Sequence, residues 1–485
     1  MCKKDFLIPL LLLIPISIYF LSLEPSLVGG DGDEYLLQSY QNGIAHPCGY
    51  PVYLWIGKIL LVLTNNNLNS MNIVSLLFSV FTLFLLYFFI RKIGVSPIAA
   101  IVTVLIYSFT PMFWKFATQA EVYNVNIFFL TLMLYLFYLW SEKHNTKNLL
   151  ASGFVYGISL GVYFANILIL IAIVIFLVYE CKREGKNFIK QLLVTLVAIV
   201  IGATGPFLYI YFRSKVLPPT GSIYNPDNFK NFLLYLKGVQ YRTLYFMGWK
   251  LLLNRIISNS ALFIISFTGF GLFFAFKGII SEWAKRRSYT LFLLLSAMIN
   301  FGYFSYYLAG DSYNMLGPSF LVVTIFIGLG LNKIYSEKMN LMKIQIICIA
   351  LFITVITLQI YPPSCYRIIN PFRKNRAFLN QCKEILSSLP SNSVFFAYWP
   401  RYTSFLCLQT ILKQRQDISI YEISNRSRNY KINNEIKTFT WHEYIDNHIL
   451  DTDRPIISMW IDNYLANKYL VKKIDKKLFQ IYPKK

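Results

Sequence analysis

Three carboxylates in four residues, Asp31, Asp33 and Glu34, form the local pattern in this sequence best suited to chemistry. They follow a pair of glycines a few residues after the first apolar stretch. A carboxylate in this position could accept a proton from a sugar or protein hydroxyl. Hard oxygen ligands of this kind could also bind a divalent ion. The alternative interpretation is a solvated acidic turn that caps a helix beginning near Glu34.

Four further side chains are suited to substrate chemistry. Glu121 lies where two apolar stretches meet, and an acidic group beside apolar helices is unfavourable unless it is paired or hydrated. Arg213 and Arg242 could grip a phosphate bidentately, or they could be ordinary interfacial arginines. His46 could serve as a base or a contact, although a lone histidine in a turn with proline and glycine more often has a structural role.

The elements that must position these side chains are apolar blocks close to membrane thickness. Of the 485 residues 56% are hydrophobic and only 14% are charged, against about 25% charged in a typical soluble domain. This composition excludes one large soluble core and predicts an α-helical polytopic membrane protein with about eleven transmembrane helices. The predicted spans are 6–23, 70–90, 96–115, 125–140, 148–163, 165–180, 189–211, 258–277, 289–308, 315–333 and 341–361.

The formal net charge of +23 would suggest a nucleic-acid partner in a soluble protein. Here the basic residues recur in every second loop, as in Arg91-Lys92 and Lys182-Arg183, so we expect no nucleic acid and favour membrane lipid as the partner. The positive-inside rule then predicts a cytoplasmic N-terminus and an extracytoplasmic C-terminus. The loops predicted outside are 24–69, 116–124, 212–257 and 309–314.

Two outer loops are long, and the chain changes character after them. Loop 24–69 contains an apolar segment, 52–63, that is too short to span and is typical of an interfacial helix. Loop 212–257 has a helical pattern from Phe229 to Tyr245. The sequence therefore predicts a transmembrane domain over 1–361 and a small soluble extracytoplasmic α/β domain over 362–485. The strands predicted there are Ser393–Tyr398, Ile418–Ile423 and Pro455–Trp460, and the helices are Asn375–Leu389 and Thr403–Lys413.

Two stretches of the first outer loop carry a resemblance to a known family. They read Gly-Asp-Gly-Asp-Glu over 30–34 and Gly-Ile-Ala-His-Pro-Cys-Gly-Tyr-Pro over 43–51. This is similar to the bacterial and animal family of protein O-mannosyltransferase-like proteins, members of the GT-C superfamily that use polyprenyl-phosphate-linked sugars. Cys48 stands where that family usually has a second proline, and Ile167 where a histidine often follows Asn166. The resemblance extends through about residue 335.

The resemblance implies roles for particular residues. Asp31 is the expected catalytic carboxylate, with Glu34 beside it. No cofactor or metal site is firmly implied, although a divalent ion stays an option at these carboxylates. The implied substrate-binding positions are Asp33, His46, Tyr50, Glu121, Tyr123, Asn166, Arg213, Gln240, Arg242 and Asp311.

The activity implied by the resemblance is an inverting glycosyl transfer. A sugar would pass from a polyprenyl-phosphate donor to a hydroxyl of a protein or glycan acceptor, outside a bacterial cytoplasmic (inner) membrane, with Asp31 as the base. One alternative is a transporter or flippase of a lipid-linked sugar, whose functional charges should lie near mid-membrane. Another is a non-catalytic envelope scaffold, which would tolerate the loss of Asp31.

Overall fold

The computed structural model describes residues 8–241, 248–309, 311–336, 376–424, 426–432, 435–449, 453–475 and 477–484. The chain forms two compact units. The first, here called the membrane unit, comprises Met1–Leu23, Ser75–Pro206 and Tyr241–Arg373. The second, the loop–tail unit, comprises Glu24–Val74, Phe207–Gln240 and Lys374–Lys485. Loop 24–69, part of loop 212–257 and the tail thus belong to one unit. The predicted boundary at 361 lies outside the described residues.

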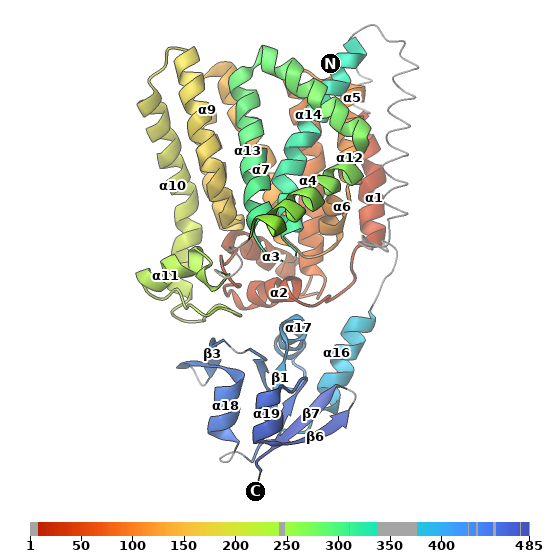
Figure 1. Ribbon diagram of the computed structural model, residues 1–485, viewed down its shortest axis with the longest axis vertical. Helices are drawn as coiled ribbons and strands as arrows, with labels where there is room; N and C mark the ends of the chain where they lie inside the picture. Colours follow the sequence, from red (N-terminus) through yellow and green to blue (C-terminus); the bar gives the residue numbers. More distant parts are fainter. Residues whose placement is uncertain are drawn as a thin grey trace. The chain divides into compact units, whose positions relative to one another are not determined.

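Apolar helices build the membrane unit (Figure 1). Within it α12 packs against α14, and α7 against α8. The helices that make up this unit or enter it are α1 (Leu13–Ser22), α4 (Ser70–Ile93), α5 (Pro97–Ser108), α6 (Pro111–Thr118), α7 (Val122–Lys143), α8 (Thr146–Val162), α9 (Ile169–Arg183), α10 (Phe188–Arg213), α12 (Trp249–Lys285), α13 (Arg287–Tyr306) and α14 (Gly317–Ser336), with 3-10 turns at Ile8–Leu12, Phe164–Leu168 and Ser312–Leu316.

Seven helices among the described residues are long and apolar enough to cross a membrane, or eight if the bent pair α5 and α6 is one span. The protein is therefore an integral multi-pass membrane protein. The ten predicted spans up to residue 333 all coincide with helical segments. The predicted span 96–115 is divided into α5 and α6, because Thr110 is extended before Pro111 and the two helices bend by 69°. Span 341–361 lies outside the described residues, so the count of about eleven stays a prediction.

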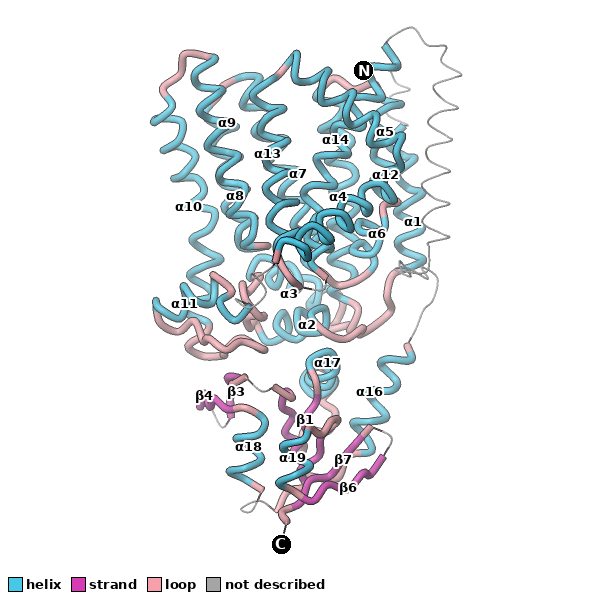
Figure 2. The backbone as a smooth tube through the Cα atoms, in the orientation of Figure 1, coloured by secondary structure: helices cyan, strands magenta, loops and turns pink. Residues whose placement is uncertain are grey.

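The loop–tail unit combines helices with two sheets, and Figure 2 shows the strands of its tail in magenta. Its five-stranded sheet has the order β2-β1-β5-β7-β6, with β1 parallel to β2 and β5. The strands are β1 (Val394–Ala397), β2 (Ser419–Glu422), β3 (Arg428–Ile432), β4 (Glu435–Phe439), β5 (Ile456–Ser458), β6 (Leu470–Asp475) and β7 (Leu478–Tyr482). The helices are α2 (Asp31–Gln41), α3 (Pro51–Leu63), α11 (Phe229–Leu236), α16 (Ala377–Ser388), α17 (Trp399–Thr410), α18 (Trp441–His448) and α19 (Asn463–Lys468).

The predicted α/β character of the tail is confirmed, with β1, β2 and β5 at the three predicted strands. The sequence did not predict β6, because its side chains are mostly exposed and polar and it lies at the sheet edge. The helix predicted over Phe229–Tyr245 ends at Leu236, since Gly238 two residues later has a φ of 60° that turns the chain.

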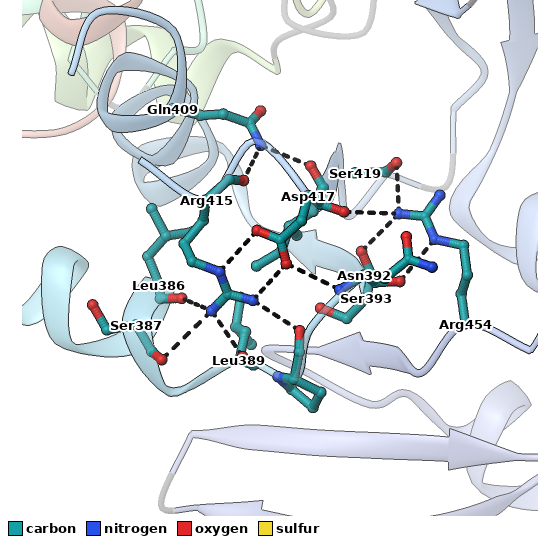
Figure 3. Close-up of polar contacts among 12 residues, drawn as sticks. Leu386, Ser387, Leu389, Asn392, Ser393, Gln409, Arg415, Asp417, Ser419 and Arg454 are labelled. Carbon is teal, nitrogen blue, oxygen red and sulfur yellow. Dashed lines mark hydrogen bonds and ion pairs between the residues drawn. The ribbon is translucent and has the colours of Figure 1, made fainter. Parts of the chain in front are cut away.

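Two arginines fix the start of β2 (Figure 3). Arg415 forms two 2.9 Å bonds with the carboxylate of Asp417 and also donates to carbonyl oxygens at the end of α16. Arg454 donates to the Ser393 carbonyl and the Ser419 hydroxyl, both at 3.0 Å. Because bidentate arginine pairs impose a defined geometry, the N-terminal end of β2 is held against its neighbours.

Candidate active site

The acidic cluster lies in the first turn of α2. This helix begins at Asp31, three residues earlier than predicted, and carboxylates in a first turn are favoured by the helix dipole. The chain enters the helix through Gly29, which has a φ of 90° and lies so close to the Pro400 carbonyl that an added Cβ would be 2.7 Å from its oxygen. Only glycine fits there without strain.

The three carboxylates differ sharply in exposure. The side chain of Asp31 is 42% exposed, whereas Asp33 is 2% and Glu34 0% exposed. Since Asp31 is the only one of the three that reaches solvent, it is the member of the cluster able to meet a substrate hydroxyl.

Glu34 binds His46 through both carboxylate oxygens. Its Oε1 accepts the backbone N–H of His46 at 2.7 Å, and its Oε2 lies 2.5 Å from His46 Nδ1. The other ring nitrogen, Nε2, then lies 3.8 Å from Asp31 Oδ2 and 3.3 Å from Tyr50 Oη. Burial raises the pKa of Glu34 to about 7, and the nearby His46 opposes this shift. The structure therefore brings four predicted site residues, Asp31, Glu34, His46 and Tyr50, into one cluster.

Helix α17 of the tail contacts the same turn, a contact that sequence reasoning missed. The indole N–H of Trp399 donates to Asp31 Oδ1 at 2.9 Å. One turn later, the Thr403 hydroxyl donates to the Gly30 carbonyl at 3.0 Å, and Gly30 N–H donates to the Pro400 carbonyl at 3.0 Å. The available signal was the position of Trp399 directly after a parallel strand, where sheets commonly bind ligands.

Asp33, a predicted substrate-binding residue, is buried and hydrogen-bonded on both carboxylate oxygens. Its carboxylate accepts the backbone N–H groups of Val28 and Gly29, both at 3.1 Å, and the Ser404 hydroxyl at 2.5 Å. It thereby holds the loop before α2 to α17. Burial raises the pKa of Asp33 to about 6, although the three donors act in the opposite direction.

This raised pKa gives an expected pH dependence of stability. Because the folded protein binds the Asp33 proton more tightly than the unfolded chain, the stabilisation is complete below about pH 4 and is lost as the pH rises through about 6. Asp33→Asn removes this titration. Relative to wild type, its free energy of unfolding should therefore rise by on the order of 3 kcal/mol between pH 4 and pH 7.

Thermal or denaturant unfolding of the purified protein across this pH range measures the difference. The matched control is Glu384→Gln, at an exposed carboxylate on α16. A constant offset between wild type and Asp33→Asn at every pH would contradict the expected linkage.

Two other predicted residues of this unit are also hydrogen-bonded within the protein. Arg213, a predicted phosphate contact, donates to the carbonyl oxygens of Asn42 and Gln41 at the C-terminal end of α2, at 2.6 and 3.0 Å. The side-chain oxygen of Gln240 accepts the backbone N–H of Ile223 at 3.0 Å and so links two parts of the same loop. Arg242 lies outside the described residues.

The remaining predicted residues belong to the membrane unit. Glu121 and Asp311 both interact electrostatically with Lys115. The ring of Tyr123 lies 4.6 Å from a phenylalanine ring of α6. Asn166 is buried and donates to the side chain of a buried asparagine of α7 at 2.6 Å, so it closes the break before α9.

The side chains of Asp31, Glu34 and His46 each place one potential metal ligand within 4.8 Å of the others. Both Glu34 oxygens are already bonded to His46, and Asp31 Oδ1 accepts the Trp399 indole. A carboxylate oxygen that accepts one hydrogen bond keeps a second lone pair, so these side chains could hold a divalent ion as well as form a hydrogen-bonded chain.

Apolar helices, an acidic helix start in the loop over 24–69 and a small α/β tail define a membrane protein with the GT-C fold. The chain resembles ArnT from Cupriavidus metallidurans bound to undecaprenyl phosphate, with a TM-score of 0.63, 11% identity and coverage of 99% of this chain and 98% of that one. The apo state of the same protein gives a TM-score of 0.64.

The N-terminal part is more specific. Residues 31–187 match the family model of the Protein O-mannosyl-transferase TMEM260 N-terminal domain. Protein O-mannosyl-transferase tmem260 of Dictyostelium discoideum is 24% identical over 249 residues, covering 48% of this chain and 30% of that protein. The mouse relative, Protein O-mannosyl-transferase TMEM260, is 22% identical over 233 residues, covering 47% of this chain and 33% of that protein. The chain thus spans about a third of the length of these relatives.

Proposed function

We propose that this protein is an inverting glycosyltransferase that moves a sugar from a polyprenyl phosphate to a protein or glycan hydroxyl, with Asp31 as the general base. The observation that carries this proposal is the exposed carboxylate of Asp31, held by Trp399 on one oxygen and facing His46 on the other. The names of the relatives and the lipid phosphate bound to ArnT support the reaction class.

The proposed reaction is a single displacement. Asp31 accepts the proton of the acceptor hydroxyl while that oxygen attacks the anomeric carbon from the face opposite the phosphate. The bond from the anomeric carbon to the phosphate oxygen breaks, and the polyprenyl phosphate leaves with the electron pair. One displacement inverts the anomeric centre. The Glu34–His46 pair keeps a polar group beside Asp31.

We place this reaction on the outer side of a bacterial cytoplasmic membrane. The support is the basic character of the alternate loops, which favours a cytoplasmic N-terminus and an outer loop–tail unit.

The direct test is transfer by the reconstituted full chain. The donors are a panel of undecaprenyl- and dolichyl-phosphate sugars, and the acceptors are hydroxyl-bearing peptides and oligosaccharides. Transfer with inverted configuration supports the proposal. No transfer by a well-folded protein with any donor would favour a transporter or a scaffold.

Trp399→Phe tests how Asp31 is oriented. The substitution keeps an aromatic ring but removes the indole N–H that donates to Asp31 at 2.9 Å. Since a hydrogen bond to a charged group contributes about 1.5–3 kcal/mol, we expect kcat to fall about tenfold or more, with the donor KM little changed. Steady-state kinetics with Trp460→Phe, at an exposed tryptophan of the same tail, provides the control. An unchanged kcat would remove Trp399 from this role.

A further inference from the structure

A pocket of about 420 Å³ lies within the loop–tail unit, apart from the residues assigned above. Its walls come from β2 and β3, from one face of α17, from the last residue of α2 and from part of the second outer loop. None of the residues predicted from the sequence as site residues lines it.

Two strands that line this pocket, β2 and β3, each pair with one strand among the described residues. β2 is the outermost strand of its sheet, and β3 pairs with β4 alone among the described residues. In β2 the backbone N–H groups of Ser419 and Ile423 donate toward β1, at 3.1 and 2.8 Å. Because backbone groups alternate along a strand, the N–H and C=O of Ile420 face away from β1. An edge of this kind is a template for another extended chain.

The lining combines aromatic and polar side chains, and its charged residues, Glu422, Arg428 and Lys431, give it a net charge of +1. The rings of Tyr402, Tyr421 and Tyr430 contribute to it. The one buried carboxylate, Glu422, is paired with Arg428 at 2.9 Å, so the pair neutralises itself. Aromatic rings together with hydrogen-bonding side chains suit a polar peptide chain. The Tyr430 hydroxyl accepts the backbone N–H of Glu422 at 3.3 Å, so this outward N–H of β2 is already bonded. The outward backbone groups of Ile420 are the ones that a partner strand would bind.

The edge is also preformed. The network in Figure 3 fixes the first residue of β2 through Arg454 and the preceding loop through Arg415. A partner strand would therefore bind without first ordering β2, and preorganisation of this kind favours affinity.

The pocket lies on the helix that contacts Asp31. Tyr402, Leu406 and Gln409 line it from one face of α17, and the first residue of α17 is Trp399. The rings of Trp399 and Tyr402 are 6.3 Å apart. The lining residues Tyr402 to Gln409 follow Trp399 by three to ten residues. At about 1.5 Å per helical residue they lie about 5–15 Å from Trp399 along the helix axis. An extended chain at about 3.3 Å per residue bridges this distance in about two to five residues.

We infer that this pocket binds an extended segment of a protein acceptor, added as a strand against β2, about two to five residues from the hydroxyl that receives the sugar. The inference rests on the proposed glycosyl transfer and assigns its acceptor to the proteins. β-Strand addition supplies main-chain hydrogen bonds for affinity, while side-chain pockets set the sequence preference.

A backbone scan of an acceptor peptide tests this without altering the enzyme. Each residue flanking the modified serine or threonine is N-methylated in turn, and transfer by the full-length wild type is measured. We expect the acceptor KM to rise about tenfold at one or two positions two to five residues from the hydroxyl, with kcat little changed. Equal KM values at every position, or efficient transfer to oligosaccharides but to no peptide, would overturn the inference while leaving the glycosyl transfer standing. No transfer to any acceptor would overturn both.

Ile420→Pro provides the complementary variant, because proline removes the outward N–H of β2. It should raise the peptide KM about tenfold while the donor KM and donor hydrolysis stay at wild-type values. The control is Ile436→Pro on β4, which does not line the pocket. If Ile420→Pro does not fold, the peptide scan on the wild type decides the question. A folded Ile420→Pro protein with a wild-type peptide KM would overturn the inference.

Discussion

Asp31→Asn is expected to lower transfer by about 10³-fold, the largest loss from any single substitution in this protein. Asparagine has the same size, and its amide oxygen can still accept the indole N–H of Trp399, so the local fold should persist. It cannot take up the acceptor proton, and removal of a general base typically lowers the rate by about 10²–10⁴-fold. The expected signature is a lower kcat with a nearly unchanged donor KM.

The measurement is transfer from a polyprenyl-phosphate sugar at matched abundance of wild type and variant. Asp227→Asn, at a carboxylate of the second outer loop that is hydrogen-bonded to neighbouring asparagines, controls for the loss of one negative charge. Wild-type rates for Asp31→Asn would exclude Asp31 as the base and would move attention to His46, whose Nε2 lies 3.8 Å from it.

Glu34→Gln is expected to have the second largest effect, a decrease in kcat of about 10²-fold. The carboxylate holds both the backbone and the ring of His46, at 2.7 and 2.5 Å. The amide has only one acceptor oxygen, so its NH2 group must face either the backbone N–H or the ring Nδ1 of His46, and the ring should turn or change tautomer. Glu34 acts through His46 and is therefore a positioning residue.

The pH profile separates this role from a simple loss of stability. Burial raises the pKa of Glu34 to about 7, and its ionised form is the one that accepts the ring N–H. Wild-type kcat should therefore rise as the pH increases through about 7, and Glu34→Gln should lose this step. Retention of the same step in a folded Glu34→Gln protein would assign the titration to another group. Thermal unfolding of both proteins checks that the variant is folded.

Much of the fold could be predicted because membrane helices depend on a local property. Runs of apolar residues near membrane thickness marked ten helical segments between residues 8 and 336, and alternating short runs marked β1, β2 and β5. The bend between α5 and α6 was missed, since hydropathy does not register a single extended residue before Pro111. β6 was missed because an exposed edge strand has no apolar alternation.

The cluster of Asp31, Glu34 and His46 could be predicted as a set of residues but not as a geometry. The short motif named all three, because they lie within one loop. Their exposures depend on packing: Asp31 and Asp33 are two residues apart in the same helical turn, yet α17 covers Asp33 while the side chain of Asp31 stays 42% exposed. The exposure of Asp31 and Asp33 differs because of packing against α17, which lies far away in the sequence, so no local sequence pattern predicts this difference.

Trp399 shows where sequence reasoning ends. Its hydrogen bond to Asp31 joins residues 368 positions apart. Local composition determines helices, caps and spans, because these depend on neighbouring residues. Contacts between distant segments depend on how completed elements pack. The sequence alone therefore predicted a membrane protein and the residues of its acidic cluster. The pairing of that cluster with the tail, and the pocket between β2 and β3, arose only when the folded elements came together.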